Sequence, residues 1–272
     1  MKRNFTGERL ETFIYNRIAI EHLHRYSMVF DYVKDKVVLD IASGEGYGSN
    51  LLSEHATFVY GVDIDEKCIN DAKLKYKKNN IEFKTGNTSK IPLENGSIDV
   101  VLSFETIEHH DEHEEMMMEI KRVLKPNGLL IISTPDKLYY SDKRKVENEF
   151  HVKELYKEEF TDLISKYFDF KQMLSQLYNK GTSLIVDSLP QNEIKFFTGN
   201  YTHIKDKAVN PLFHIIIASN VEFKNQSTSV FDGAHLINAE IAKQIHKSAT
   251  YKLGHFILFP FKLVKKIIKK IL

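Results

Sequence analysis

Short apolar runs alternate with longer amphipathic segments along the first half of the chain. The runs are rich in β-branched residues, as in strands buried on both faces, and they cover residues 36–42, 57–63, 81–85, 98–104 and 129–135. Between them, apolar positions recur at helical spacing in residues 48–55, 66–78 and 111–124. This alternation predicts right-handed βαβ crossovers and an open, doubly wound α/β sheet with helices on both faces. Ligands of such sheets bind at the carboxyl ends of the strands.

Both flanks of this region also carry patterns. Residues 8–33 have apolar positions at roughly helical spacing, which predicts one or two leading helices. Residues 168–177 and 211–220 are typical of a closing pair of strands, so that we expect seven strands in a mostly parallel sheet. The stretch between this pair looks irregular, and a loop of about 33 residues usually serves a function.

We therefore expect three regions. Residues 1–35 form an N-terminal helical segment, residues 36–220 form the sheet domain with an insertion at about 178–210, and residues 221–272 form a C-terminal linker and tail. Residues 221–232 have the composition of a linker, and Asp232 is suited to cap a helix that follows it.

Composition narrows the class of protein. With 42% apolar and 28% charged residues, 272 residues can bury one sizeable core, so neither disorder nor a fibrous repeat is indicated. Cys68 is the single cysteine and cannot form an intramolecular disulfide. The N-terminal sequence MKRNFTGERL lacks the apolar core of a signal peptide, so we expect a cytoplasmic protein.

The segment VVLDIASGEGYGSN, residues 37–50, ends a strand in a glycine-rich loop. A phosphate-binding P-loop would need a lysine and a hydroxyl after the last glycine, and none follows Gly48. The dinucleotide fingerprint requires glycine at its first, third and sixth places, but Ser49 occupies the sixth. S-adenosylmethionine, which carries no phosphate, is the ligand that fits the loop best.

Acidic and polar side chains follow the first three strands at the places where this ligand needs them. Asp40 could accept a hydrogen bond from the ammonium group, directly or through water, and Gly44 lets the backbone pass close to the methionine moiety. Asp63 ends the second strand and could bind both ribose hydroxyls. Asn87 and Thr88 could contact the edge of the adenine.

Four motifs in this order and spacing, DIASGEGYG, GVDID, GNTSKIPL and VLKPNGLLIIS, resemble those of class I S-adenosylmethionine-dependent methyltransferases over residues 36–135. Two positions depart from the family pattern, Asn87 where an acid is more frequent and Asn127 where a second glycine is common. The resemblance implies a Rossmann-like sheet with an antiparallel last strand, an N-terminal helical lid and S-adenosyl-L-methionine as cofactor. The cofactor-binding residues that we predict are Asp40, Ala42, Gly44, Gly46, Asp63, Ile64, Asn87, Thr88 and Phe104.

Five flanking motifs, GERL, EHLHRY, SFETIEHH, STPDKLYYSD and NEFHVKEL, are similar to those of a bacterial branch of this family that accompanies surface-glycan assembly. The resemblance implies O-methylation of a sugar hydroxyl or phosphate in a glycan or glycolipid intermediate. Three alternatives stay open: methylation of a quinone or another small metabolite, a non-catalytic cofactor-binding module, and nucleic-acid modification. We expect no specific nucleic-acid partner, because the body of the chain is mildly acidic.

The segment FETIEHHDEHEE, residues 104–115, follows the fourth strand, where the family places the methyl-donor end of the site. Glu105 and His109 are the predicted catalytic residues, since a hydroxyl acceptor must lose its proton. A packing or positioning role for His109 is the alternative. His109 and His113 are four residues apart, but HHDEH is not the zinc-protease motif HExxH, and we expect no metal. The acids in 111–115 are suited to a helix N-terminus.

Arginines are scarce in this chain, yet four of its six lie in the first 25 residues. Together with neighbouring histidines they could hold a carboxylate or phosphate of the acceptor, whereas the alternative is surface ion pairing with Glu8, Glu11 and Glu21. Aromatic residues after the fifth strand could contact a sugar or simply belong to the core. The acceptor-binding residues that we predict are Arg9, Arg17, His22, Arg25, Tyr140 and His151.

The net charge of +1 conceals an asymmetry, because residues 251–272 hold six lysines and no acid. The segment FKLVKKIIKKIL, residues 261–272, separates into an apolar and a lysine-rich side when wound as a helix. With residues 256–260 it could lie on an anionic membrane surface, or it could pack on the domain or a second copy of the chain. The apolar run is too short to span a bilayer. We expect peripheral attachment to the inner face of the cell membrane.

Overall fold

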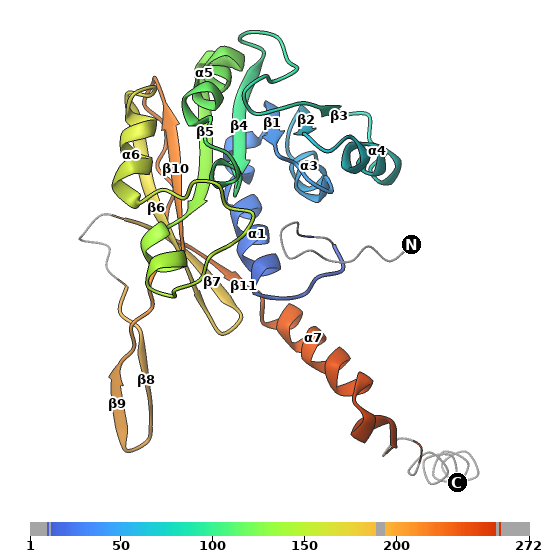
Figure 1. Ribbon diagram of the computed structural model, residues 1–272, viewed down its shortest axis with the longest axis vertical. Helices are drawn as coiled ribbons and strands as arrows, with labels where there is room; N and C mark the ends of the chain where they lie inside the picture. Colours follow the sequence, from blue (N-terminus) through green and yellow to red (C-terminus); the bar gives the residue numbers. More distant parts are fainter. Residues whose placement is uncertain (1–9, 11, 189–193, 254–255, 257–272) are drawn as a thin grey trace.

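The described residues fold around a nine-stranded mixed sheet with helices on both faces (Figure 1). The structure is a computed structural model that describes residues 10, 12–188, 194–253 and 256. The strands lie in the order β11-β7-β6-β10-β5-β4-β1-β2-β3. The glycine loop follows β1, at the centre of the parallel half of this sheet.

All five strands predicted in the first half of the chain are confirmed. They are β1 (Val37–Ile41), β2 (Phe58–Asp63), β3 (Ile81–Thr85), β4 (Ile98–Phe104) and β5 (Leu124–Pro135). Neighbours in this half pair in parallel. Successive residues of β1 point to opposite faces, where Val38 joins one core and Leu39 the other. Burial on both faces explains why these strands appear as nearly continuous apolar runs.

The predicted closing pair of strands is also present. β10 (Phe213–Ser219) lies between β5 and β6 (Phe170–Asn179) and is antiparallel to both. The prediction of an antiparallel last strand therefore holds for β10 within these seven strands of the sheet.

The prediction of seven strands in total was wrong, because β7 (Thr182–Asp187) and β11 (Ser229–Asp232) extend the sheet beyond β6. β6 and β7 form a hairpin whose turn, Lys180 and Gly181, has positive φ at both residues. β11 lies inside the predicted linker, where a four-residue strand with alternate exposed positions gives little apolar signal. The predicted irregular insertion also contains a separate hairpin, β8 (Phe197–Asn200) and β9 (His203–Asp206).

Helices cover the two faces of the sheet unequally. α5 (His113–Val123) and α6 (Lys157–Ser165) bury their apolar sides in one core. α1 (Arg17–Met28), α2 (Phe30–Val33) and α3 (Tyr47–Leu52) contribute to the core on the opposite face. The remaining helices of the described chain are α4 (Glu66–Lys75), the single turns η1 (Ile107–His109) and η2 (Leu138–Asp142), and α7 (Ala234–Lys247).

Helix α1, predicted to belong to a lid, packs against the added strands of the sheet. Its His24 is 2% exposed and lies 2.9 Å from the hydroxyls of both Ser183 in β7 and Ser229 in β11. Burial lowers the pKa of His24 to about 4, so the ring is neutral at pH 7 and offers one donor and one acceptor to these two hydroxyls. The predicted N-terminal helical segment thus shares, through α1, the core of the sheet domain.

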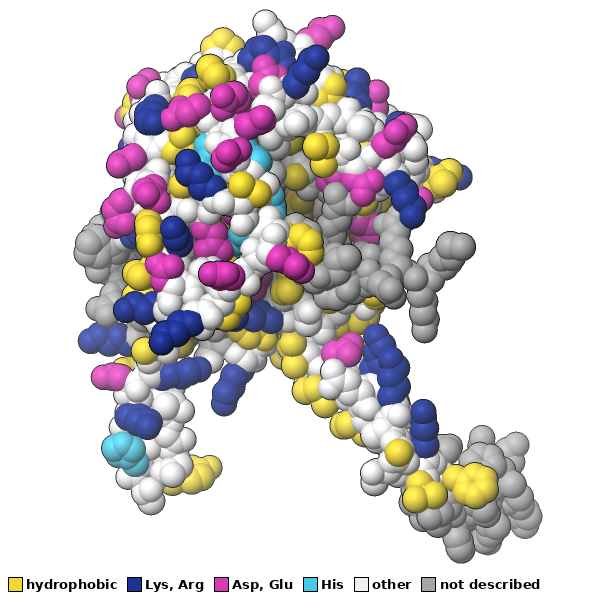
Figure 2. Space-filling view, viewed as in Figure 1, with side chains coloured by type: hydrophobic (Ala, Val, Ile, Leu, Met, Phe, Trp, Pro, Cys, Tyr) yellow, Lys and Arg dark blue, Asp and Glu magenta, His cyan; other side chains and the backbone are white. Residues whose placement is uncertain are grey.

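Two elements project from the body on the same side in Figure 1, the β8–β9 hairpin and α7. None of the residues of α7 is buried, and Figure 2 shows apolar side chains along one edge of this helix and basic ones along the other. The helix that we predicted after Asp232 is confirmed, but its N-cap is Gly233 and not Asp232, whose carboxylate accepts a hydrogen bond from the Ala234 amide at 3.0 Å. The predicted basic helix 261–272 lies outside the described residues. Within them, every helix is too short or too polar to cross a bilayer.

We predict that His24→Ala destabilises the fold by about 2–4 kcal/mol, because it leaves a buried void and removes the hydrogen bonds that join α1 to the buried Ser183 and the partly buried Ser229. The free energy of unfolding from urea titration measures this loss. His55→Ala is the matched control, since His55 packs on Phe30 at the other end of this helical region and makes no link between α1 and β7 or β11. Equal effects of the two substitutions would contradict the assignment of α1 to the core.

Candidate functional site

A cavity of about 710 Å³ opens at the carboxyl ends of β1, β2, β4 and β5, with α1 as one wall. Most of the residues that we predicted from the sequence line it. From the cofactor set these are Ala42, Gly44, Asp63, Ile64, Asn87, Thr88 and Phe104. From the catalytic and acceptor sets they are Glu105, His109, Arg17, His22, Arg25, Tyr140 and His151. Arg9 lies outside the described residues.

The glycine loop has the backbone that its composition predicts. Gly44 has φ +54°, and a Cβ built on it would meet nothing within 4 Å, so its open side faces the cavity. Ala42 adopts φ +60° without being glycine, a strained conformation of the kind that gathers at functional sites. Gly46 does not line the cavity. It allows close packing instead, because a Cβ there would lie 2.8 Å from the ring of Phe83.

The Asp63 carboxylate is fixed at the rim of the cavity by two backbone amides. One oxygen accepts a hydrogen bond from Gly44 N at 2.8 Å and the other from Asp65 N at 2.9 Å. Each carboxylate oxygen can accept more than one hydrogen bond, so this arrangement leaves acceptor capacity for two adjacent hydroxyls. The hydrogen bond from Gly44 N also fixes the position of the glycine loop relative to β2.

Asp40 is 1% exposed and is not among the residues that line the cavity. Its two oxygens accept hydrogen bonds from Tyr26 Oη at 3.1 Å and Ser49 Oγ at 2.7 Å. Burial, with a further contribution from the negative charge of Asp63, raises the pKa of Asp40 to about 6, although both hydrogen bonds oppose this shift. Tyr26 does line the cavity, so it is the group through which Asp40 faces a ligand.

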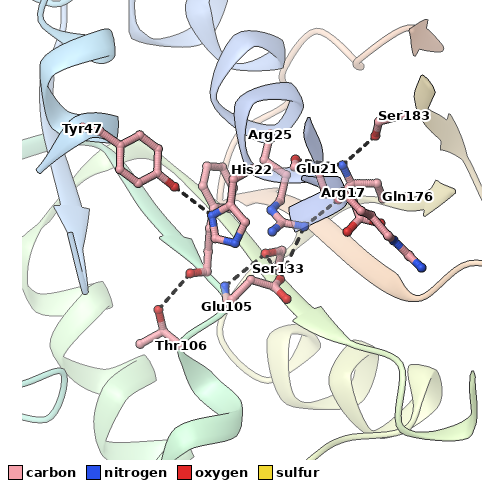
Figure 3. Close-up of polar contacts among 11 residues, drawn as sticks. Arg17, Glu21, His22, Arg25, Tyr47, Glu105, Thr106, Ser133, Gln176 and Ser183 are labelled. Atoms are coloured by element: carbon pink, nitrogen blue, oxygen red, sulfur yellow. Dashed lines mark hydrogen bonds and ion pairs between the residues drawn. The ribbon is translucent and has the colours of Figure 1, made fainter. Parts of the chain in front are cut away.

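Glu105 directly follows β4 and has a strained conformation, with φ +53°. Its carboxylate accepts a hydrogen bond from Ser133 Oγ at 2.5 Å and lies 3.8 Å from the Arg25 guanidinium (Figure 3). Arg25 is fully buried, donates to Gln176 at 2.6 Å and stacks 4.9 Å above the ring of Phe213. These contacts fix the Glu105 carboxylate on the cavity wall.

Arg17 and His22 line the cavity on the α1 side, and both have partners within the protein. Arg17 forms a two-pronged contact with Glu21 at 2.7 and 2.8 Å, which is the ion pairing that we considered as the alternative to acceptor binding. His22 Nδ1 lies 2.9 Å from the Tyr47 hydroxyl (Figure 3). Burial and the nearby charge of Arg25 lower the pKa of His22 well below its usual value, so this ring is neutral at pH 7.

Two histidines face each other across the opposite wall. His109 Nδ1 donates to the carbonyl oxygen of Phe150 at 3.0 Å, and His151 Nδ1 lies 2.5 Å from the Glu154 carboxylate. The two rings meet edge to face, with centroids 5.2 Å apart, and His151 also stacks on Tyr140 at 5.3 Å. A carbonyl oxygen only accepts, so the hydrogen of His109 is on Nδ1 and its lone pair is on Nε2.

His113 does not belong to this group. Its Nε2 lies 2.8 Å from the carbonyl oxygen of His110, within the turn that leads into α5. The acidic residues Glu114 and Glu115 lie in the first turn of α5, which agrees with their interpretation as helix N-terminal charges.

Sequence reasoning missed several residues of the wall. Glu108 is 1% exposed and lines the cavity, and burial together with the charge of Glu105 raises its pKa well above the usual value. Its signal was present in the motif SFETIEHH, which we quoted without assigning this glutamate. Tyr26 and Asn148 also lie in quoted motifs, EHLHRY and NEFHVKEL, and were not assigned, whereas Arg144 carried no local signal.

Comparison with known proteins identifies the region around the cavity. Residues 39–132 match the family model described as a methyltransferase domain. A probable S-adenosylmethionine-dependent methyltransferase of Mycolicibacterium smegmatis is 34% identical over 146 residues, which are 53% of this chain and 56% of that protein. A protein of Mycobacterium tuberculosis with the same description is 37% identical over 128 residues, 47% of this chain and 46% of that protein. The chain thus spans about half the length of these relatives.

Solved structures of low sequence identity share the fold. A possible histamine N-methyltransferase from Thermotoga maritima superposes with a TM-score of 0.54 at 20% identity, over 75% of this chain and 93% of that one. The YcgJ protein of Bacillus subtilis superposes with a TM-score of 0.55 at 15% identity, over 74% of this chain and 100% of that one. The sequence matches, together with the glycine loop and Asp63, show an S-adenosylmethionine-dependent methyltransferase domain over residues 39–132, whose cofactor is S-adenosyl-L-methionine, and the solved structures show the shared fold.

Proposed function

We propose that this chain transfers a methyl group from S-adenosylmethionine to a hydroxyl, or a phosphate, of a glycan or glycolipid intermediate. The observation that carries the proposal is the composition of one continuous cavity. Its donor half holds the glycine loop and Asp63, and its other half holds Glu105, His109, His151 and Tyr140. Donor groups and candidate acceptor groups thus share one space.

The donor half fits S-adenosylmethionine in shape and charge. The open side of Gly44 gives the methionine moiety room beside the backbone, and the Asp63 carboxylate is placed to accept hydrogen bonds from the ribose hydroxyls. Ile64 and Thr88 border the space next to Asp63, where we place the adenine. Phe104 would lie nearest the methyl end, because it terminates β4 directly before Glu105.

When bound, this cofactor supplies a methyl group on a positively charged sulfur, and the protein must hold the acceptor oxygen in line with it. In the transfer the carbon–sulfur bond breaks, a carbon–oxygen bond forms, and a hydroxyl acceptor loses its proton. Glu105 is the residue that we propose accepts this proton, because Ser133 and Arg25 fix its carboxylate on the wall. His109, whose Nδ1 donates to the Phe150 carbonyl oxygen, also lines this half of the cavity.

The part of the cavity lined by Tyr140, Arg144 and His151 offers contacts for an extended acceptor. The rings of Tyr140 and His151 stack on each other, and the Arg144 guanidinium lies 5.5 Å above Tyr140. This wall gives a sugar a flat aromatic surface bordered by hydrogen-bond donors. A matched relative from Mycobacterium tuberculosis is named a phthiotriol/phenolphthiotriol dimycocerosates methyltransferase, at 29% identity over 42% of each chain. The substrate in that relative's name supports, for this chain, an acceptor of lipid character.

We also propose that the protein attaches peripherally to the inner face of the cell membrane. Support comes from α7 and the turn after it, which expose Ile241, Ile245 and Leu253 beside Lys243 and Lys247. The same exposed apolar residues could instead join two copies of the chain, so a homo-oligomer is the alternative. Sedimentation with anionic vesicles, compared with the oligomeric state in their absence, distinguishes the two.

The function as a whole is tested by mass spectrometry of surface glycans from cells with and without the gene. Loss of a methyl group from one sugar or phosphate supports the proposal. Methylation of a quinone or another small metabolite by the purified protein, with unchanged glycans, would replace it. A protein that binds S-adenosylmethionine but never turns it over with cell-envelope extract would be a non-catalytic module.

We predict that Asp63→Ala weakens S-adenosylmethionine binding by about 10–100-fold, because hydrogen bonds to a charged group contribute about 1.5–3 kcal/mol. Isothermal titration calorimetry measures the dissociation constant. Glu66→Gln in the first turn of α4 is the matched control and keeps the affinity of the unchanged protein. Tight binding of NADH in place of S-adenosylmethionine would contradict the assignment of the donor half.

Binding of S-adenosylmethionine is expected to depend on pH through Asp40. Its pKa of about 6 means that the carboxylate is mostly protonated at pH 5 and mostly ionised at pH 7. A cationic ligand favours the ionised form, so affinity should rise with pH through this range, by up to about tenfold. Asp40→Asn should remove the dependence, and calorimetry at pH 5, 6 and 7 checks both proteins. An unchanged pH profile in Asp40→Asn would assign the effect to another group.

We predict that Glu105→Gln lowers kcat for methyl transfer by about 10²–10⁴-fold, the contribution typical of a positioned general base. The affinity for S-adenosylmethionine should stay within a few-fold, because Glu105 belongs to the acceptor half. Glu115→Gln, an exposed position in the first turn of α5, serves as control. A fall in cofactor affinity that accounts for the whole effect would move Glu105 out of its proposed role.

A further inference from the structure

Three side chains with metal-binding atoms meet in the acceptor half of the cavity. Glu108, His109 and His151 each place one such atom within 4.8 Å of the other two. Glu108 and His109 belong to η1, whereas His151 comes from the loop before α6. The fold therefore gathers ligands from two segments about 40 residues apart.

Backbone contacts hold these two segments together. The carbonyl oxygen of Glu108 accepts hydrogen bonds from Val152 N at 2.8 Å and Lys153 N at 3.1 Å. His109 Nδ1 donates to the Phe150 carbonyl in the opposite direction. With three hydrogen bonds across the junction, His109 and His151 face each other without help from a ligand, which is the preorganisation that a binding site needs.

The outer nitrogens of the two histidines have partners of the kind found behind metal ligands. Metal-binding histidines usually donate their second N–H to a carbonyl or a carboxylate, which fixes the ring and its tautomer. His109 has the Phe150 carbonyl in this place, and His151 has the Glu154 carboxylate at 2.5 Å. In both rings Nε2 is then the nitrogen that can bind a cation.

Glu108 supplies the second, independent observation. The residue is 1% exposed, and its Oε2 is buried and has no hydrogen-bond partner among the described residues. A buried carboxylate oxygen without a partner is costly, and a bound cation would remove that cost. A lone histidine pair without this oxygen would not distinguish a metal site from ring packing.

We propose that Glu108, His109 and His151 bind a divalent first-row transition-metal ion, for which Mn²⁺ and Zn²⁺ are the probes of choice. Imidazole nitrogens suit zinc and iron, and a carboxylate extends the range to manganese. Ligand atoms of a tetrahedral ion with bonds of about 2.1 Å lie about 3.4 Å apart, so the three atoms, which lie within 4.8 Å of one another, would close by about 1 Å when the ion binds. The proposal departs from our expectation of no metal, which we drew from His109 and His113.

The catalytic consequence rests on the proposed methyl transfer. Three protein ligands leave a coordination position open, where the acceptor hydroxyl could bind and have its pKa lowered. Its proton then passes to Glu105, the carbon–sulfur bond of the donor breaks, and the new carbon–oxygen bond forms without any change in the oxidation state of the metal. His109 thereby holds the cation, and Glu105 alone accepts the proton.

The test uses the full chain, first stripped of metal with a chelator and then titrated with Mn²⁺ and with Zn²⁺. We expect saturable binding by calorimetry, and for Mn²⁺ a loss of the free-ion electron paramagnetic resonance signal, at one ion per chain. Glu108→Gln and His151→Asn should each weaken binding at least about tenfold, and Glu154→Gln by about 10–100-fold through the orientation of His151. Glu112→Gln and His110→Asn, which alter cavity residues outside the cluster, should bind like the unchanged protein.

Thermal unfolding without metal verifies that each variant is folded. Absence of saturable binding to the unchanged protein, or unchanged binding by a folded Glu108→Gln, would overturn the metal site. Full methyl transfer by the stripped protein together with absent metal binding would refute the metal site and leave the proposed function intact. Metal binding without any methyl transfer would support the metal site and refute the proposed function.

Discussion

The hydrogen bond from the Gly44 amide to the Asp63 carboxylate is the contact on which the donor half depends. It joins the loop after β1 to the end of β2, two neighbouring parallel strands. Gly44 makes this bond with φ +54°, and the Asp65 amide holds the other carboxylate oxygen. A side chain at Gly44 would strain the backbone and point into the open space. The glycine and the acid therefore act as one unit, although 19 residues separate them.

The donor half and the parallel sheet could be predicted from sequence because their determinants are local. Strands buried on both faces appear as apolar runs, and the loop residues follow them directly along the chain. β11 escaped prediction because it has only four residues with alternate exposed positions, and β7 because it lies in the stretch that we interpreted as an irregular insertion. Asp40 was found by its position, but its burial behind hydrogen bonds from Tyr26 and Ser49 could not be derived from spacing.

The acceptor half is built differently, from contacts between distant segments. Arg25 in α1 meets Gln176 in β6 across 151 positions, and His109 meets Phe150 across 41. Sequence patterns record such contacts only as isolated residues, so Glu108 and Arg144 were passed over while Glu105 and His109 were found. The curated relatives match this chain over about half its length, and the family model matches residues 39–132, which hold the glycine loop and Asp63.

The balance of charge on the cavity wall favours a hydroxyl over a phosphate as acceptor. Among the described residues, six carboxylates line the cavity against three arginines. Arg17 is paired with Glu21, and Arg25 is held between Gln176 and Glu105, so Arg144 is the arginine with the fewest commitments to an acid. An anionic acceptor would approach the Glu105 carboxylate at close range and be repelled, whereas a sulfonium donor would be attracted. The negative potential of this wall does not repel a neutral acceptor, which can lose its proton to Glu105. The acidity of the wall therefore favours O-methylation of a hydroxyl.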